Sequence, residues 1–379
     1  MYSPDPSRAH HALPGIAGKV LVASHGSWNR NPWIGYRVDT FDIDLSGTTP
    51  SYTVSGTSIL VPPLREVSGS GLRIRPVDLL TSPADGSLLM TADRDDFMGG
   101  ARGGGLYRVA GNLSAASSGG TLISPLPNAA DSILSGAGTL ERLVALPCAR
   151  QMASSPTDPS LLYVSSFGGF CPDEPNGAIY VVELDLINGG VTRHATLLSG
   201  LHHPQGIDIS NSSDGSGATL YIATSGSTTS NRGNCVLRLA GVDAIARARL
   251  GGTIAALTPT DPRLADVACG FTRVQSAHSW RSLRVAPSGD YAIVSVGADC
   301  NWPCEANEPT DLQTTHVRID LQSGSASVAA TGIRNAIGLH FLPNGDMLFS
   351  AFGSDNGQGI PGGGNGRNVP DCELNVLRR

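Results

Sequence analysis

The sequence predicts an all-β protein and, more specifically, a six-bladed β-propeller. Three observations lead to this fold: the composition is rich in turn residues, one turn-and-strand unit recurs along the chain, and the units are evenly spaced. The 379 residues include 47 Gly and 25 Pro, and only 15% are charged. Such a composition is typical of many short strands joined by turns that contain Gly or Pro.

The recurring unit is a turn, then an apolar strand, then a small polar residue that begins a loop. The interval that runs through the C-terminus back to the first unit resembles the others, as a closed ring requires. The repeat therefore predicts six four-stranded blades around one axis. The alternative is a pair of three-unit β domains. The apolar strands centre on positions 55 to 73 residues apart: Val22, Met90, Tyr163, Tyr221, Val294 and Phe349.

We expect a single domain over residues 1–379, in which residues 110–138, rich in Ser, Gly and Ala, form a long connecting loop. Residues 240–250 fit one or two helical turns between blades. No apolar run is long enough to span a membrane, and the N-terminal residues do not resemble a signal peptide. The net charge of −6 argues against a nucleic-acid partner. The oligomeric state stays open.

The seven cysteines have no zinc-type spacing that involves two pairs. Disulfides are therefore the expected use of these residues, with one thiol left over, and they indicate an extracellular or periplasmic location. The pairing stays open.

The stretch 276–302 is the most informative part of the chain. Two apolar runs, one ending at Val285 and one covering 291–296, flank the turn 287–289, which predicts a β-hairpin. The start of the first strand and the end of the second are neighbours in such a hairpin. We therefore expect His278 and Arg281 to lie near the loop that contains Asp299.

Arginine or histidine stands at the start of the inner strand in five of the six units. If these side chains converge on the axis, they form a positive, anion-binding pocket. The alternative is that strand starts are polar because they are exposed. The residues are Arg73 and Arg75; Arg150 and Gln151; His202, His203 and Gln205; His278 and Arg281; and Arg334 and Asn335.

Loops after the second strands form the other side of the same rim. Carboxylates and carbonyls in such loops suit a hard cation such as Ca²⁺, although the run Asp93–Asp96 also fits a solvated turn. The loop Gly353–Asn356 is the better candidate because it follows Arg334 and Asn335 within one hairpin.

At these residues the chain resembles the soluble quinoprotein sugar dehydrogenases, propellers that hold pyrroloquinoline quinone (PQQ) and Ca²⁺. It is most similar to the sorbosone and aldose dehydrogenase branch. The matching motifs are HGSWNRNPWIGYRV (25–38), RIRPVDLLTSPADGSLLMTAD (73–93), HSWRSLRVAPSGDYAIVSVGADCN (278–301) and GIRNAIGLHFLPNGDMLFS (332–350).

The resemblance implies a role for each matching residue. His278 matches the histidine that accepts the proton of the sugar's anomeric hydroxyl, and Arg334 matches the arginine near the quinone oxygens. Gly353, Ser354 and Asp355 fall at or beside the Ca²⁺ ligands. The implied cofactor-contacting residues are Asn335, Arg73, Arg75 and Arg281, with Gln151 matching a glutamine on the substrate side.

The chain also departs from the family pattern. Ala336 replaces the usual proline after the Arg-Asn pair, and the lysine expected near the quinone is absent, with Arg30 as a candidate replacement. The motifs at 25–38 and 73–93 normally lie near the C-terminus. We therefore expect a circular permutant or a slice across two tandem copies.

The resulting hypothesis is an oxidoreductase that uses PQQ and Ca²⁺ to oxidise a sugar and passes electrons to an external acceptor. Two alternatives remain on the same scaffold: a Ca²⁺-dependent lactonase-like hydrolase, and a non-catalytic propeller that binds carbohydrate or protein. The identities of the sugar and of the acceptor stay open.

Overall fold

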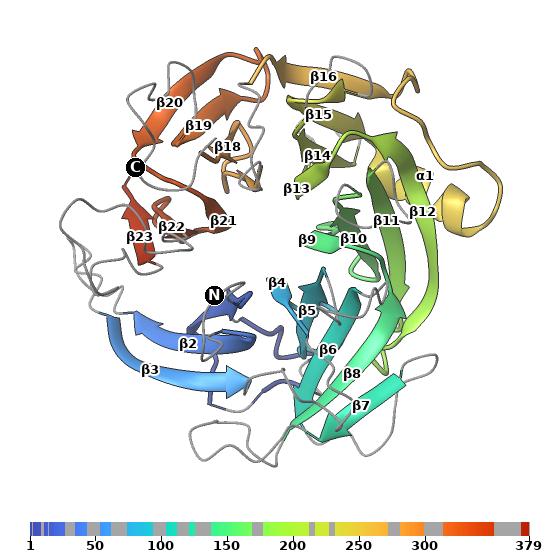
Figure 1. The fold of residues 1–379 in the computed structure, drawn as a ribbon. Helices are drawn as coiled ribbons and strands as arrows, with labels where there is room; N and C mark the ends of the chain where they lie inside the picture. The colour runs from blue at the N-terminus through green and yellow to red at the C-terminus, as the bar shows by residue number, and fades with distance from the viewer. Residues whose placement is uncertain are drawn as a thin grey trace.

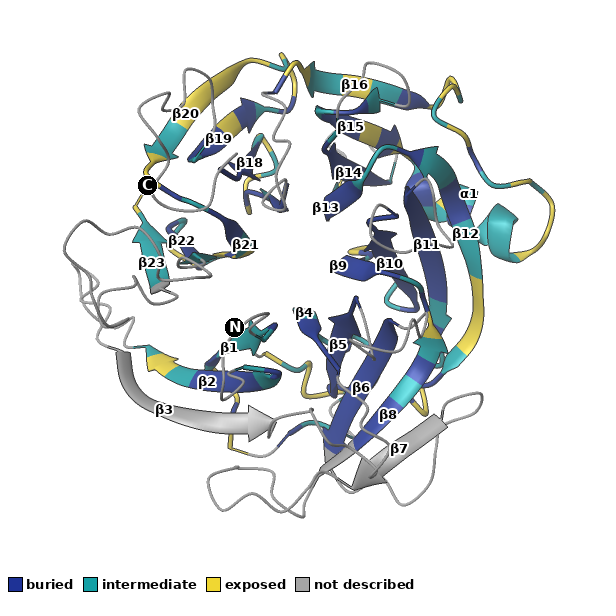
Figure 2. Cartoon of the chain, viewed as in Figure 1, coloured by how far each residue is buried: buried dark blue, intermediate teal, exposed yellow. Residues whose placement is uncertain are grey.

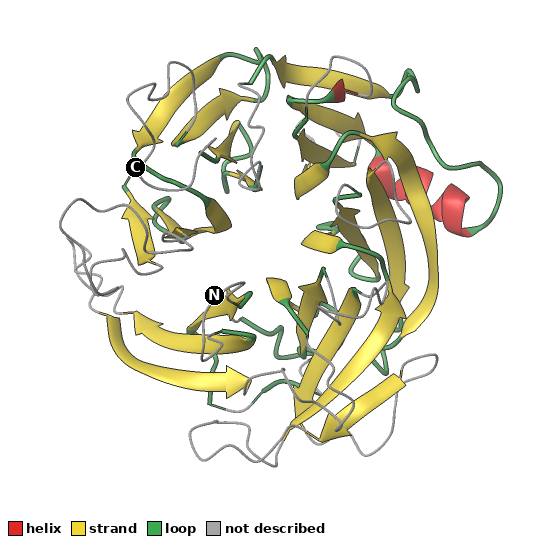
Figure 3. Ribbon diagram, in the orientation of Figure 1, coloured by secondary structure: helices red, strands yellow, loops and turns green. Residues whose placement is uncertain are grey.

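The computed structural model describes residues 1, 3–8, 11–13, 15–26, 35–43, 54–61, 74–93, 104–111, 121–125, 138–168, 177–211, 217–226, 232–271, 281–298, 314–351 and 373–378. Strands dominate these residues, so the all-β prediction is confirmed. The α-helix α1 (Val242–Leu250) lies on the outside of the molecule (Figure 3), within the segment predicted to contain helical turns.

The strands form six antiparallel sheets around a common axis (Figure 1). In spatial order, the first three sheets are β1 (Val20–Ser24), β2 (Arg37–Ile43) and β3 (Val54–Val61); β4 (Pro76–Thr81), β5 (Leu88–Ala92), β6 (Gly105–Gly111), β8 (Gly138–Ala145) and β7 (Thr121–Pro125); and β9 (Ala149–Ser154), β10 (Leu161–Ser166), β11 (Gly177–Leu184) and β12 (Val191–Leu201).

The other three sheets follow in chain order. They are β13 (Pro204–Asn211), β14 (Ala218–Thr224), β15 (Cys235–Ala240) and β16 (Leu264–Cys269); β17 (Leu283–Val285), β18 (Tyr291–Val296), β19 (Thr315–Asp320) and β20 (Ala326–Thr331); and β21 (Ala336–Phe341), β22 (Met347–Ala351) and β23 (Glu373–Leu377).

The prediction of a six-bladed propeller is wrong. In five sheets the repeat strand is second in order and follows an inner strand near the axis; these repeat strands are β5, β10, β14, β18 and β22. The remaining copy, around Val22, is β1, and no strand precedes it among the described residues. The arrangement is a propeller with five blades in which the repeat strand follows an inner strand, and a three-stranded N-terminal sheet beside them; three of the five blades have the predicted four strands, one has five, and one has three among the described residues. The spacing of repeat strands could not reveal this difference, because it does not report whether an inner strand precedes each one.

Burial explains why the repeat strands are continuous apolar runs. Every residue of β5, β10 and β14 is buried (Figure 2), because neighbouring sheets cover both faces of each strand. The outermost strand β20 is largely exposed. The core is therefore a series of layers between sheets rather than one central cluster.

The inner strands pack closely against one another. A Cβ atom at Gly206 on β13 would lie 2.2 Å from the carbonyl oxygen of Arg281, so only glycine fits between these two strands. The Ser165 hydroxyl donates to the carbonyl oxygen of Gln205 at 2.6 Å and so joins the third sheet to the fourth. This packing fixes the relative positions of the strand starts.

The first and last sheets also meet. Val20 of β1 is buried together with Leu342 and Leu348 of the last sheet, and Phe41 of β2 and Val376 of β23 pack against them. Side chains therefore join the sheets at the two ends of the described chain.

Two local predictions can be compared directly. The hairpin of β17 and β18 is confirmed, with Gly289 at φ 77° in its turn. Residues 110–138, predicted to be a connecting loop, contain β7, which is the edge strand of the second sheet.

Assignment of the whole chain to one domain stays a prediction. Among the described residues, no helix is both long and apolar enough to cross a membrane.

Candidate functional site

The predicted site residues that the structure describes lie at the starts of inner strands. Arg75 precedes β4, Gln151 is on β9, Arg281 precedes β17, and Arg334 and Asn335 precede β21. The other predicted residues lie outside the described part of the chain: His278, Arg73, Arg30, Gly353, Ser354 and Asp355.

Arg75 is buried, with 1% of its surface exposed, and is held by the first sheet. Its guanidinium donates to the carbonyl oxygen of Gly26 at 3.0 Å and to the Tyr36 hydroxyl at 2.8 Å, and it lies 4.9 Å from the centre of the Tyr36 ring. Tyr36 has a positive φ of 60° and follows Gly35. Gly26 and Tyr36, which lie between β1 and β2 in the sequence, thus hold this arginine in place.

His25 and Asp93 connect Arg75 with a second arginine. His25 Nε2 lies 3.1 and 3.2 Å from the two Asp93 carboxylate oxygens, and Arg150 Nη1 lies 2.9 Å from Asp93. The Nη1 atom of Arg75 lies 3.4 Å from His25 Nδ1. Residues from three sheets therefore form one buried group, which we call the Arg75–Asp93–Arg150 cluster and which includes His25.

The chemistry of these partners fixes the tautomer of His25. Burial raises the pKa of Asp93, but the contacts with His25 and Arg150 outweigh burial and hold that pKa well below its usual range. A carboxylate only accepts hydrogen bonds and a guanidinium only donates them, so His25 Nε2 carries the proton and Nδ1 accepts. Burial lowers the pKa of His25 despite the neighbouring carboxylate, which agrees with a neutral ring. His25 therefore orients Arg75 and Asp93 rather than exchanging a proton.

An aromatic stack continues from this cluster. The Arg150 guanidinium lies 5.2 Å from the centre of the Phe167 ring, and the His203 ring stacks on the same Phe167 at 4.4 Å. The His202 ring meets His203 edge-on at 4.4 Å. Burial, with the charges of His202 and Arg150, lowers the pKa of His203 to about 4, so its ring is neutral near pH 7.

The backbone around this stack is unusual. His203 has a φ of 43°, and Cys148, whose carbonyl oxygen accepts the Phe167 N–H, has a φ of 50°. Residues other than glycine seldom adopt such angles, and they are found disproportionately at binding sites. A Cβ atom at Gly226 would lie 1.8 Å from His202 Nδ1, so glycine at 226 leaves room for the His202 ring.

Gln151 joins three inner strands. Its side-chain oxygen accepts the N–H groups of Ile207 at 3.1 Å and Leu283 at 3.2 Å, and it is 4% exposed. This oxygen thus has a structural use, and a contact between Gln151 and substrate stays a prediction.

Arg281, Arg334 and Asn335 occupy the next positions around the ring. The backbone N–H of Arg281 donates to the Gln205 side chain at 2.6 Å, and burial lowers the pKa of Arg281 to about 10. The carbonyl oxygen of Arg334 accepts the Ala298 N–H at 2.8 Å. Asn335 is 4% exposed. Arg75 and Arg150 lie in one buried cluster, and the convergence of all five strand starts on one pocket stays a prediction.

Two contributors were not predicted from the sequence. Tyr36 and Phe167 face buried arginines, yet each is a single aromatic residue beside glycine in a loop. The available signal was their position next to strands, with Tyr36 directly before β2 and Phe167 directly after β10. Asp93 had been considered for a cation site or a solvated turn, and the structure pairs it with Arg150 instead.

Comparisons with known proteins show limited similarity. No known protein-family profile matches the chain. An uncharacterised protein from Borreliella burgdorferi is 39% identical over 92 residues, which is 24% of this chain and 20% of that protein. This match is too short to show a family.

The solved structures that are similar to this chain include proteins of different kinds. The PQQ domain of a pyranose dehydrogenase from Coprinopsis cinerea matches 61% of this chain and 51% of its own, with 16% identity and a TM-score of 0.44. A Trichoderma reesei carbohydrate-active enzyme of family AA12 matches 69% and 55%, with 20% identity and a TM-score of 0.45. A nidogen/laminin complex matches 88% and 86%, with 11% identity and a TM-score of 0.48.

The chain thus spans about half the length of the first two structures. At these identities and TM-scores, the similarity supports no conclusion about the fold or the activity of this chain.

Proposed function

We propose that this chain is a quinoprotein oxidoreductase that oxidises an aldose or a related, sorbosone-type sugar. PQQ and Ca²⁺ are the cofactors, and an external acceptor takes up the electrons. The observation that carries the proposal is the Arg75–Asp93–Arg150 cluster, in which one buried guanidinium group pairs with the Asp93 carboxylate and a second reaches that carboxylate through His25.

The described residues fit a planar anion with several carboxylates. Arg75 and Arg150 are fixed by neighbours, and Arg281 is fully buried at the start of another inner strand. A ligand that brings negative charge suits buried guanidinium groups, and a rigid guanidinium fork recognises a carboxylate with two hydrogen bonds. Arg73, which lies outside the described residues, and Arg75 would hold PQQ carboxylates, Arg281 would contact the cofactor, and Arg334 would lie near the quinone oxygens.

The cluster favours binding over proton transfer. Tyr36, Gly26 and His25 hold Arg75 from three directions, so little side-chain freedom is lost when a ligand binds. PQQ, when bound, supplies an electrophilic quinone carbon that accepts hydride from the sugar. His278 would accept the proton of the sugar hydroxyl, and Gly353, Ser354 and Asp355 would hold Ca²⁺; these roles follow from the resemblance and lie outside the described residues.

The test is reconstitution of the purified chain with PQQ and Ca²⁺, alone and together. We expect PQQ to bind, as seen by a change in its absorption, and dye reduction by glucose or sorbosone to require both additions. The Arg75→Gln variant should weaken PQQ binding, and His278→Ala should abolish turnover while PQQ still binds.

The matched control is Arg193→Gln. Arg193 is an exposed arginine on the outer strand β12, paired with Glu183, and its loss should leave PQQ binding unchanged. Lactone hydrolysis without quinone would replace the proposal with the hydrolase alternative. Carbohydrate binding with no PQQ uptake would replace it with the non-catalytic alternative.

A further inference from the structure

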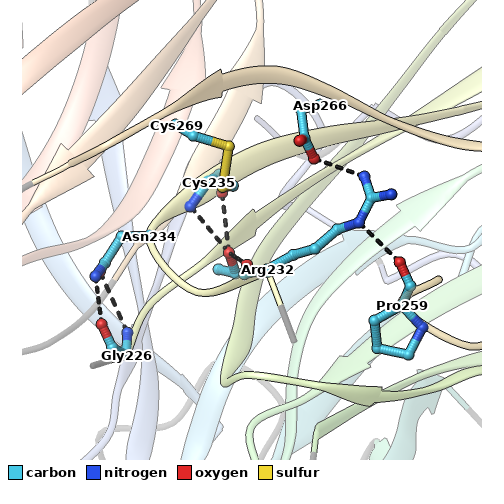
Figure 4. Close-up of a disulfide and its surroundings, with 8 residues drawn as sticks. Gly226, Arg232, Asn234, Cys235, Pro259, Asp266 and Cys269 are labelled. Atoms are coloured by element: carbon cyan, nitrogen blue, oxygen red, sulfur yellow. Dashed lines mark hydrogen bonds and ion pairs between the residues drawn. A yellow bond between two sulfur atoms is a disulfide. The ribbon is translucent and has the colours of Figure 1, made fainter. Parts of the chain in front are cut away.

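A disulfide on the outer strands of the fourth sheet lies outside the candidate site. Cys235 on β15 and Cys269 on β16 are directly opposite in the strand register and are joined by a disulfide (Figure 4). This bond confirms the expectation that cysteines of this chain form disulfides. Because β16 is the outermost strand of its sheet and Cys269 is exposed, reagents in solvent reach the pair.

A β-bulge brings a carboxylate to the same face. Along a regular strand, residues three apart point to opposite faces, so Asp266 and Cys269 would be separated. Here the register shifts: Val236 pairs with Ala268, whereas the next residue, Leu237, pairs with Asp266. The extra residue, Val267, reverses the alternation and places Asp266 on the side of the two cysteines.

The resulting group has the composition of a metal site. One ligand atom each from Cys235, Cys269 and Asp266 lie within 4.8 Å of one another. Two thiolates and one carboxylate are a ligand set that Zn²⁺ accepts, with a water molecule as the fourth ligand. Cysteines that face each other across two strands can turn toward one ion without movement of the backbone.

Arg232 completes the electrostatic environment. Its Nη1 atom lies 2.6 Å from the Asp266 Oδ1 atom, and its Nε–H donates to the carbonyl oxygen of Pro259 at 2.7 Å (Figure 4). The second carboxylate oxygen of Asp266 remains available for an ion, because a carboxylate accepts several partners.

We propose that reduction of the Cys235–Cys269 disulfide creates a binding site for a soft divalent metal ion such as Zn²⁺. A dithiol reductant donates two electrons and two protons: its own thiols become a disulfide, and two cysteine thiols form. Metal binding then releases these two protons. Two thiolates, the Asp266 carboxylate, the Arg232 guanidinium and the divalent ion sum to zero charge, so the site is neutral when filled.

The experiment compares the oxidised chain with the chain reduced by a phosphine, which does not compete as a thiol ligand. Each form is titrated with Zn²⁺ by calorimetry and with Co²⁺ by absorption spectroscopy. We expect one ion per reduced chain, with a Co²⁺ spectrum of tetrahedral thiolate coordination, and no such binding by the oxidised chain. A Cys235→Ser, Cys269→Ser double variant measures the contribution of the other cysteines.

Asp266→Asn supplies the sharper test, because its exposed side chain can be changed without loss of the fold. Loss of a residue that supports a metal ligand typically weakens metal binding by roughly 10–100-fold. Loss of a direct ligand such as Asp266 should weaken it at least as much. The matched control is Asp261→Asn, an acid paired with Arg263 in the same segment, which should bind Zn²⁺ as the wild type does. Unchanged Zn²⁺ affinity in Asp266→Asn, or equal Zn²⁺ binding by the oxidised chain, would overturn the proposal. Neither measurement involves PQQ or turnover.

Discussion

Replacement of Asp93 by asparagine should destabilise the protein strongly although the side chain keeps its shape. Asp93 is 5% exposed and accepts contacts from Arg150 at 2.9 Å and His25 at 3.1 Å. Asparagine removes the charge and leaves the Arg150 guanidinium buried without this carboxylate. Removal of one partner from a buried ion pair costs about 3–5 kcal/mol, and we expect Asp93→Asn to lower the free energy of unfolding by an amount in this range.

Urea unfolding, followed by circular dichroism, measures this difference at pH 7. The matched control is Asp261→Asn, because the Asp261–Arg263 pair lies near the surface and such pairs contribute about 0–1 kcal/mol. A loss in Asp93→Asn no larger than that of the control would refute the argument that this carboxylate balances buried charge.

The pH dependence provides a second check on Asp93. Its folded pKa lies below the unfolded value near 3.8, so the stabilisation is present above pH 4 and is lost as the pH falls further. The difference between wild type and Asp93→Asn should therefore shrink in acid. A difference that stays constant below pH 4 would contradict the assigned ionisation.

Three further predictions concern packing and burial. Gly206→Ala should lower the free energy of unfolding by about 1–3 kcal/mol or more, because the added Cβ atom would lie 2.2 Å from a backbone atom. The control in the same urea assay is Gly251→Ala, where the atom nearest to the added Cβ lies at 3.2 Å. Tyr36→Phe removes the hydroxyl that accepts a hydrogen bond from Arg75. A hydrogen bond to a charged group is worth about 1.5–3 kcal/mol, so this variant should lower the free energy of unfolding by an amount in this range. Burial lowers the pKa of His316 to about 4. The contribution of this histidine to the free energy of unfolding is therefore complete above pH 6.5, and it falls by about 2 kcal/mol by pH 5, because the unfolded chain takes up the proton first. His316→Phe should lose this part of the acid slope without destabilisation at pH 7, since neither ring nitrogen of His316 has a hydrogen-bond partner within the described part of the chain. An unchanged slope would contradict this.

Local sequence patterns predicted individual strands better than they predicted the number of blades. The turn-and-strand unit identified strands such as β5, β10 and β14, because strands covered on both faces are continuous apolar runs. The same pattern could not show that Val22 lies on the first strand of its sheet, since an inner strand leaves no mark on the spacing of its neighbours. The count of six equivalent blades failed for this reason.

The candidate site was predictable in residue type and less so in partners. The positions of Arg75 and Arg150 at strand starts follow from the hairpin topology. The pairing of Arg150 with Asp93 and the link from Asp93 through His25 to Arg75 do not, because the carboxylate belongs to a different strand, whose loop also fitted a solvated turn. Likewise, Asp266 joins the cysteine pair only through a bulge, and a one-residue shift of register has no signature in composition or periodicity.

The contact between the first and last sheets has a consequence for the order of folding. At the other junctions the two sheets are consecutive in the chain, so closing each contact orders a modest length of backbone. Val20 and Leu348 come together only when almost the whole chain is already arranged, and contacts of such long range tend to form late. This interface should therefore lose hydrogen-exchange protection before the interior of the third and fourth sheets does.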